Sequence, residues 1–122
     1  MTSKTKKIII TALLTAALVA IPTPVFAETV RDDGNEWLAK CNDTGSYVQQ
    51  GWCYGYTQGI SHGADVVEAA LKTDVYCAGG RTVTVGQMVD IMRNYLYRKP
   101  AKRSDKMLFV YLDAMKESFP CK

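Results

Sequence analysis

Four widely spaced cysteines limit the folds that are open to this chain of 122 residues. They are Cys41, Cys53, Cys77 and Cys121. An even number of cysteines in a small domain is typical of disulfides formed in an oxidising compartment. A structural zinc site usually uses pairs of cysteines two to four residues apart, and the gaps here are 12, 24 and 44 residues. The sequence therefore predicts two disulfides and no metal or other cofactor.

The first 27 residues have the three parts of a secretory signal peptide. A head of three lysines precedes an apolar run over residues 8–20, and Val25-Phe26-Ala27 places small or compact residues where a signal peptidase cuts. A membrane anchor needs about 20 apolar residues, and Pro22 interrupts this run too early. We predict a cleaved signal over residues 1–27 and a periplasmic domain over 28–122, with no membrane attachment after cleavage.

The charge of the chain argues against nucleic acid as a partner. The formal net charge of +3 comes from the three lysines of the signal, and residues 28–122 carry 12 basic and 12 acidic groups. Binding to nucleic acid or to an anionic membrane needs a basic excess. Within the domain the charges are segregated, with a net of −5 over residues 28–75 and +5 over residues 76–122.

Five basic residues gather where two predicted helices meet: Arg98, Lys99, Lys102, Arg103 and Lys106. Such a run is usually a solvated face. It also fits a surface for a protein with an acidic patch, or an antiparallel association of opposite halves of two copies.

The spacing of apolar residues predicts an all-α domain of four helices. A short helix is expected over residues 35–40 and a long one over about 49–72. The third helix starts at Thr84, which forms a capping box with Gln87, and stops before Pro100. The fourth starts near Ser104 and stops at Pro120. The third helix carries an apolar stripe of Val85, Met88, Val89, Met92 and Leu96, and the fourth carries Leu108, Tyr111, Leu112, Met115 and Phe119.

The long helix has a glycine at every fourth position: Gly51, Gly55, Gly59 and Gly63. Each glycine costs a helix about 1 kcal/mol relative to alanine, so a repeated series favours a face that another helix approaches closely. That helix belongs either to the same chain, which is the expectation we favour, or to a second copy in a homodimer.

The helix layout favours one of the three disulfide pairings. Cys53 and Cys77 lie at opposite ends of the long helix, about 30 Å apart, whereas a disulfide needs Cα atoms within about 7 Å. With helices two, three and four running down, up and down, Cys41 meets Cys53 and Cys77 meets Cys121. The pairing Cys41–Cys77 with Cys53–Cys121 stays open if the helices cross strongly.

We find no catalytic site in the sequence. The single histidine, His62, has Ser61 beside it and Asp65 three residues on, which resembles a Ser-His-Asp triad. Adjacent residues of a helix point about 100° apart, so Ser61 cannot present its hydroxyl to His62. Five aromatic residues around the long helix fit either a binding surface or the core: Tyr47, Trp52, Tyr54, Tyr56 and Tyr76.

Two groups of residues follow one another in a recognisable order. The first, Cys53-Tyr54-Gly55-Tyr56 with Gly59-Ile60 and Asp65, has the form C-x-G-Y-x-x-G. The second comprises Cys77, Thr84, Gln87, Val89, Tyr95-Leu96, Pro100, Ala114 and Phe119-Pro120-Cys121. In this order the residues resemble the Rap/Tai family of type VI secretion immunity proteins. Where the family often has a proline after the third cysteine, this chain has Ala78-Gly79-Gly80.

The resemblance implies a periplasmic, disulfide-linked, all-helical protein that is often dimeric. Because no catalytic site is found in the residues, we also expect that the protein is not an enzyme. It implies a partner as well, a secreted peptidoglycan amidase whose active-site cleft the immunity protein blocks. It does not transfer contact residues. We expect the contacts in the loops over residues 42–48 and 74–81, with Tyr47 and Arg81 as anchors.

Two other functions fit the same features. An acid-stress chaperone of the HdeA type is also a small helical dimer, and with one histidine its switch would lie near pH 4. A housekeeping periplasmic protein could share the fold without an immunity role, since fold does not fix function.

Overall fold

A computed structural model describes residues 31–122. Their elements are α2 (Gly34–Cys41), α3 (Tyr47–Leu71), α4 (Val85–Arg98), the short 3-10 helix η1 (Pro100–Ser104) and α5 (Met107–Ser118). The predicted all-α class with four α-helices is confirmed for these residues. The predicted signal peptide lies outside them.

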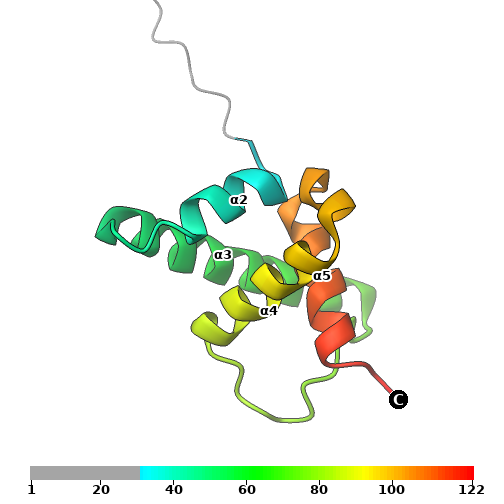
Figure 1. Cartoon of the computed structure of the whole chain (residues 1–122). Coiled ribbons are helices and arrows are strands. Elements are labelled where there is room, and N and C mark those ends of the chain that lie inside the picture. Colours follow the sequence, from blue (N-terminus) through cyan, green and yellow to red (C-terminus); the bar gives the residue numbers. More distant parts are fainter. Residues whose placement is uncertain (1–30) are drawn as a thin grey trace, which may run out of the picture. The chain divides into compact units, whose positions relative to one another are not determined.

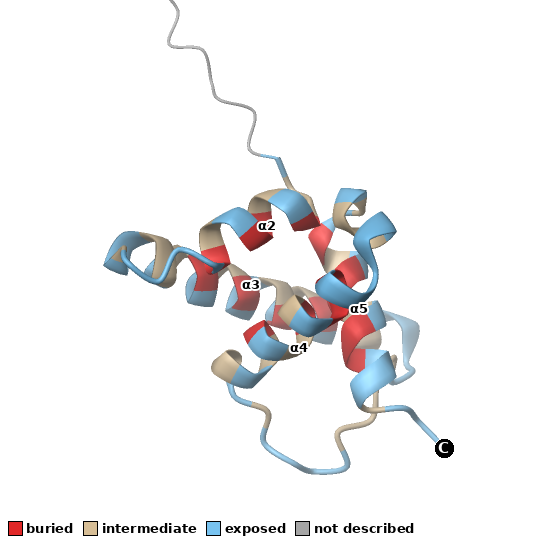
Figure 2. Ribbon diagram, viewed as in Figure 1, coloured by how far each residue is buried: buried red, intermediate tan, exposed pale blue. Residues whose placement is uncertain are grey.

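The longest helix, α3, contacts all three other α-helices. Figure 1 shows α2, α4 and α5 gathered along α3; α2 and α4 also contact each other, and α5 packs against both α3 and α4. The core is made where these helices face one another (Figure 2). Its fully buried large side chains are Trp37, Met92, Leu96, Met107, Tyr111 and Met115. The indole of Trp37 donates a hydrogen bond to Thr57 Oγ1 at 3.1 Å, which fixes α2 on α3.

The start of α4 is the one that local sequence signals predict. Gln87 N donates to Thr84 Oγ1 at 3.2 Å, and Thr84 N donates to the side-chain oxygen of Gln87 at 2.8 Å. Both halves of the capping box are therefore present, and two main-chain donors of the first turn are satisfied. The expected stripe is also confirmed, because Val89, Met92 and Leu96 are buried and the other two members are half-buried.

The predicted start of the last helix near Ser104 is wrong. Residues 100–104 form the 3-10 helix η1, and Asp105 and Lys106 are extended before α5 begins at Met107. Lys106 forms an isolated antiparallel bridge with Asp33, so the main chain at this position bonds to another segment instead of continuing a helix. The buried face of α5 is accordingly wider than the expected stripe and includes Met107, Val110 and Ala114.

The structure has the disulfide pairing that the helix layout favours. Cys41 is bonded to Cys53 with Cα atoms 5.1 Å apart, and Cys77 is bonded to Cys121 with Cα atoms 4.9 Å apart. The first bridge joins the end of α2 to the second turn of α3. The second fixes the loop after α3 to the segment after α5. Loop-closure estimates assign them about 3 and about 4 kcal/mol of stabilisation.

Close packing of the glycine stripe against another helix of the same chain, the favoured expectation, is wrong within the described residues. A Cβ atom built on Gly51, Gly55, Gly59 or Gly63 would meet nothing of that part of the chain within 4 Å. The reason is that α2, α4 and α5 cover the opposite side of α3, where Cys53, Thr57, Ser61 and Ala64 are buried.

Candidate functional site

A tight turn of two glycines determines where Arg81 lies. Gly79 and Gly80 have φ angles of +64° and +74°, a left-handed conformation that glycine adopts at little cost. Arg81 N donates to the carbonyl oxygen of Ala78 at 3.2 Å and so closes the turn. Arg81 Nε donates to the same oxygen at 2.7 Å. The main chain and the side chain of Arg81 are thus fixed by one acceptor.

Arg81 lies beside an open cavity of about 360 Å³. Its guanidinium stacks over the ring of Phe119, with the central carbon 5.0 Å from the ring centroid. The cavity lies between the 81–83 segment and α4, and it is lined by Arg81, Thr82, Val83, Gln87, Asp90, Ile91, Asn94 and Phe119. It therefore combines an apolar floor with a rim of polar side chains.

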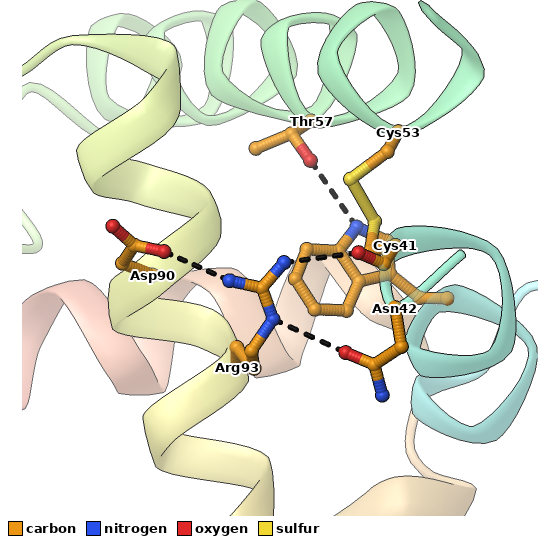
Figure 3. Close-up of a disulfide and its surroundings, with 7 residues drawn as sticks. Cys41, Asn42, Cys53, Thr57, Asp90 and Arg93 are labelled. Carbon is orange, nitrogen blue, oxygen red and sulfur yellow. Dashed lines mark hydrogen bonds and ion pairs between the residues drawn. A yellow bond between two sulfur atoms is a disulfide. The ribbon is translucent and has the colours of Figure 1, made fainter. Parts of the chain in front are cut away.

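The other expected contact loop was residues 42–48, but Tyr47 and Val48 belong to α3, so the loop is only residues 42–46. Its start is fixed by Arg93 of α4. Figure 3 shows the Arg93 guanidinium between Asp90 and the end of α2. It donates to the carbonyl oxygen of Cys41 at 2.9 Å, to Asn42 Oδ1 at 3.2 Å and to Asp90 Oδ1 at 2.8 Å. The start of this loop is consequently anchored on both the disulfide and α4.

The structure does not bring the two expected anchors into one cluster. Tyr47 lies in the first turn of α3, after Ser46, which caps that helix, and its side chain is 92% exposed. Arg81 lies in the loop that leaves the other end of α3, and it packs against Phe119 beyond α5. Both residues are exposed, each at its own place on the surface.

The outer face of α3 is exposed and carries almost no charge. Beside the glycine stripe it presents four large exposed side chains: Tyr47, Val48, Tyr54 and Val66. Isolated exposed apolar residues are normal on a protein surface, but a group that follows one helix face is typical of an interaction surface.

The five aromatic residues around α3 divide between core and surface. Trp52 stacks on Tyr56 with ring centroids 4.7 Å apart, and Lys40 lies over Trp52 at 4.3 Å. Tyr76 meets Tyr111 edge to face, and burial raises the pKa of the Tyr76 hydroxyl. Of these five residues, Tyr47 and Tyr54 are exposed and offer aromatic surface to a partner.

The Ser61–His62 pair has no triad geometry. Ser61 is buried and His62 is exposed on the same helix, so their side chains point in different directions. In residues 31–122, no group of three or more histidine, cysteine or acidic side chains is placed to hold a metal ion. None of the helices in the described range has the length and apolarity needed to cross a membrane.

The basic cluster is largely paired with acidic groups of the same chain. Arg98 and Lys99 both contact Glu117, and Lys102 contacts Asp105 and Asp113. The hydrogen bond from Lys99 holds the pKa of the Glu117 carboxyl below its usual value. These contacts connect the segment around η1 to α5, which favours a structural role for most of the cluster.

Residues 33–121 match the family model of the Rap1a immunity proteins. The chain belongs to this family. The match includes all four helices and all four cysteines. Rap1a is a type VI immunity family, so the chain is a type VI effector immunity protein, and a role as a protein-binding inhibitor follows from the family. No curated protein and no solved structure matches the chain.

Two parts of the surface of this immunity protein were not predicted from the sequence. The i,i+3 spacing of Asp90 and Arg93 indicates an ion pair, but nothing local indicates the contact of Arg93 with Cys41. The cavity beside Arg81 joins Val83 and Ile91 to Phe119, which lies far from both in the sequence. Only the packing of α4 against the end of α5 brings them together.

Proposed function

We propose that this immunity protein works in the periplasm, where it binds a cognate type VI effector that is a peptidoglycan amidase and blocks the active-site cleft of that enzyme. Membership of the Rap1a family is the observation that carries the proposal. The two disulfides support an oxidising compartment, because such bonds rarely persist in the cytosol.

The blocking surface is proposed to include Tyr47 and Arg81. Tyrosine and arginine are enriched among the residues that dominate binding energy in protein interfaces. Tyr47 is almost fully exposed, and Arg81 is pre-organised by Ala78 and Phe119, so its ordering costs little entropy on binding. Neither residue has a role in the core.

The test is inhibition of purified candidate amidases. A stoichiometric amount of the immunity protein is expected to abolish the cleavage of isolated peptidoglycan by its cognate amidase. The double variant Tyr47→Ala, Arg81→Ala is expected to weaken binding by at least about tenfold, since one interface anchor alone is often worth 2 kcal/mol or more. Binding and inhibition are followed by calorimetry and by release of cleaved peptides.

A matched control removes one aromatic and one cation elsewhere. Phe109 and Lys116 are both exposed on α5, so Phe109→Ala, Lys116→Ala is expected to inhibit like the unaltered protein. Full binding by the Tyr47, Arg81 variant would exclude these anchors. Failure to inhibit any amidase, with inhibition of another class of type VI effector, would exclude the amidase as target.

We also propose a homodimer through the glycine stripe on the outer face of α3, with Tyr47 at the start of the helix left free for the effector. The four glycines of that face meet nothing in the described residues, so their cost to the helix is offset only if another surface approaches them. The α3 helix of a second copy has the same flat glycine stripe. A two-fold axis would place the two stripes against each other.

A further inference from the structure

The cavity beside Arg81 has the composition of a binding site for one segment of a protein partner. Its volume of about 360 Å³ lies at the lower end of the ~300–1,000 Å³ that small-molecule sites occupy. Val83, Ile91 and Phe119 provide the apolar lining. That lining fits an aliphatic side chain, whose burial removes apolar surface from water.

The rim of the cavity favours an anion. Nε of Arg81 donates to the carbonyl oxygen of Ala78, and the face of the guanidinium lies over the ring of Phe119. The two terminal nitrogens of Arg81 make no hydrogen bond with the described residues. A guanidinium held in this way presents a planar pair of donors that matches a carboxylate.

The acidic residue of the rim does not cancel this preference. The Asp90 carboxylate accepts a hydrogen bond from Arg93 at 2.8 Å, so a cation of the same chain already neutralises it. The amide side chain of Asn94 adds a neutral donor to the lining. The cavity thus keeps one positive charge that has no acidic partner among the described residues.

We infer that this cavity receives an acidic–apolar segment of the effector: an aliphatic side chain enters between Val83, Ile91 and Phe119, and the side-chain carboxylate of a neighbouring residue pairs with Arg81. The inference rests on the proposed function for the identity of the partner. It adds the chemistry that the partner must present.

The test uses short peptides in place of the effector. The full chain, purified with its disulfides formed, is titrated with N-acetyl-Leu-Asp-amide and with its isosteric neutral analogue N-acetyl-Leu-Asn-amide, followed by amide chemical shifts in NMR. In low salt, the aspartate peptide is expected to bind about fivefold more tightly than the asparagine peptide. It is also expected to shift the resonances of residues 81–83 and 91–94. Higher salt is expected to reduce the difference.

Two variants assign the preference to Arg81. Arg81→Gln is expected to bind both peptides equally, whereas Lys116→Gln, which removes a cation from the exposed side of α5, is expected to keep the preference. N-acetyl-Gly-Asp-amide is expected to bind more weakly than the leucine peptide because it lacks the aliphatic side chain. Equal binding of the Asp and Asn peptides by the unaltered protein, no binding of either, or an unchanged preference in Arg81→Gln would overturn the inference.

These measurements do not need the effector, so the two proposals fail separately. A protein whose cavity selects the aspartate peptide but which inhibits no amidase contradicts the proposed function alone. A protein that inhibits its amidase while its cavity ignores the peptides contradicts this inference alone. A free C-terminal carboxylate as the true ligand would appear as tighter binding of N-acetyl-leucine than of the aspartate peptide, which also overturns the segment proposed here.

Discussion

Arg93 on α4 donates a hydrogen bond to the main-chain carbonyl oxygen of Cys41 at 2.9 Å. The two residues are 52 positions apart, and Cys41 is both the last residue of α2 and a member of the first disulfide. The carbonyl groups at the end of a helix have no partner within the helix, and Arg93 supplies one. A positive charge at this position also interacts favourably with the helix dipole.

Replacing Arg93 by methionine is expected to destabilise the protein by about 1–2 kcal/mol. Hydrogen bonds that involve a charged group contribute about 1.5–3 kcal/mol, and partial exposure of the Arg93 side chain reduces this value. Urea unfolding measures the loss, and hydrogen exchange is expected to accelerate at residues 42–46. Arg98→Met is the control, with an expected loss below 1 kcal/mol, and an equal loss in both variants would contradict the role assigned to Arg93.

Gly79→Ala is expected to destabilise the protein by about 1–2 kcal/mol, because alanine at a φ of +64° takes the left-handed conformation at that cost. A Cβ atom at Gly79 would meet nothing within 4 Å, so the loss would come from the backbone alone. Asparagine tolerates this conformation better, and Gly79→Asn is expected to lose less. Thermal unfolding compares the two, and equal stability of Gly79→Ala and the unaltered protein would contradict the turn geometry.

Gly55 provides a test of the proposed homodimer. Gly55→Ala is expected to stabilise the isolated subunit by up to about 1 kcal/mol, because the site is helical and open. Gly55→Leu places a larger side chain on the proposed seam and is expected to shift the protein from dimer to monomer in analytical ultracentrifugation. A leucine variant that sediments like the unaltered dimer, or an unaltered protein that is monomeric at high concentration, would exclude this seam.

The two disulfides are expected to differ in their rate of reduction. Cys41 and Cys53 are 6% and 3% exposed, whereas Cys121 is exposed and Cys77 is half-buried. Attack by a thiolate requires access to a sulfur atom, so a mild thiol reductant is expected to open Cys77–Cys121 at least about tenfold faster. Timed alkylation with mass spectrometry measures both rates. In guanidinium chloride the rates are expected to converge, and faster opening of Cys41–Cys53 in the folded protein would contradict the burial described.

Asp33 is expected to make the stability depend on pH in the acidic range. Asn35 N and Glu36 N each donate to Asp33 Oδ1 at 3.0 Å, and the bond from Glu36 is the main cause that holds the Asp33 pKa below its ordinary value of 3.8. Because the pKa is lower in the folded protein, the stabilisation is complete above pH 3.8 and is lost as the pH falls through the folded value.

The variant Asp33→Asn keeps a capping oxygen without a titrating group. Its free energy of unfolding is expected to change less with pH below about 4 than that of the unaltered protein. Chemical unfolding between pH 2 and 6 measures both curves. Parallel curves would show that Asp33 does not contribute to acid sensitivity.

The parts of the fold that depend on neighbouring residues were predictable from the sequence. Thr84 and Gln87 mark the start of α4, and Pro100 marks its end, because a cap or a break acts within one turn. The length of the long helix excluded a Cys53–Cys77 disulfide, and the expected down-up-down order of the helices favoured the pairing that the structure has. The outward position of the glycine stripe could not be predicted in this way. The side of α3 that the other helices cover depends on contacts between distant residues, such as the hydrogen bond between Trp37 and Thr57.

The candidate site was predictable only in part, because it also depends on contacts between residues that lie far apart in the sequence. Arg81 stands in an exposed turn, and the Gly79-Gly80 pair indicates that turn locally. The cavity needs Ile91 and Phe119 as well, and no local pattern links these two residues. The extended pair Asp105 and Lys106 was missed because the bridge to Asp33 joins segments more than 70 residues apart.

The positions of the two disulfides also determine how a pulling force would pass through the protein. Tension applied at residues 31 and 122 crosses directly from Cys41 to Cys53 and from Cys77 to Cys121. The helices α4, η1 and α5 lie inside the second covalent loop and carry no load while that bond is intact. Stretching the oxidised chain would therefore extend α2 and the segment between Cys53 and Cys77, and a break in the backbone within η1 would not separate the two pieces.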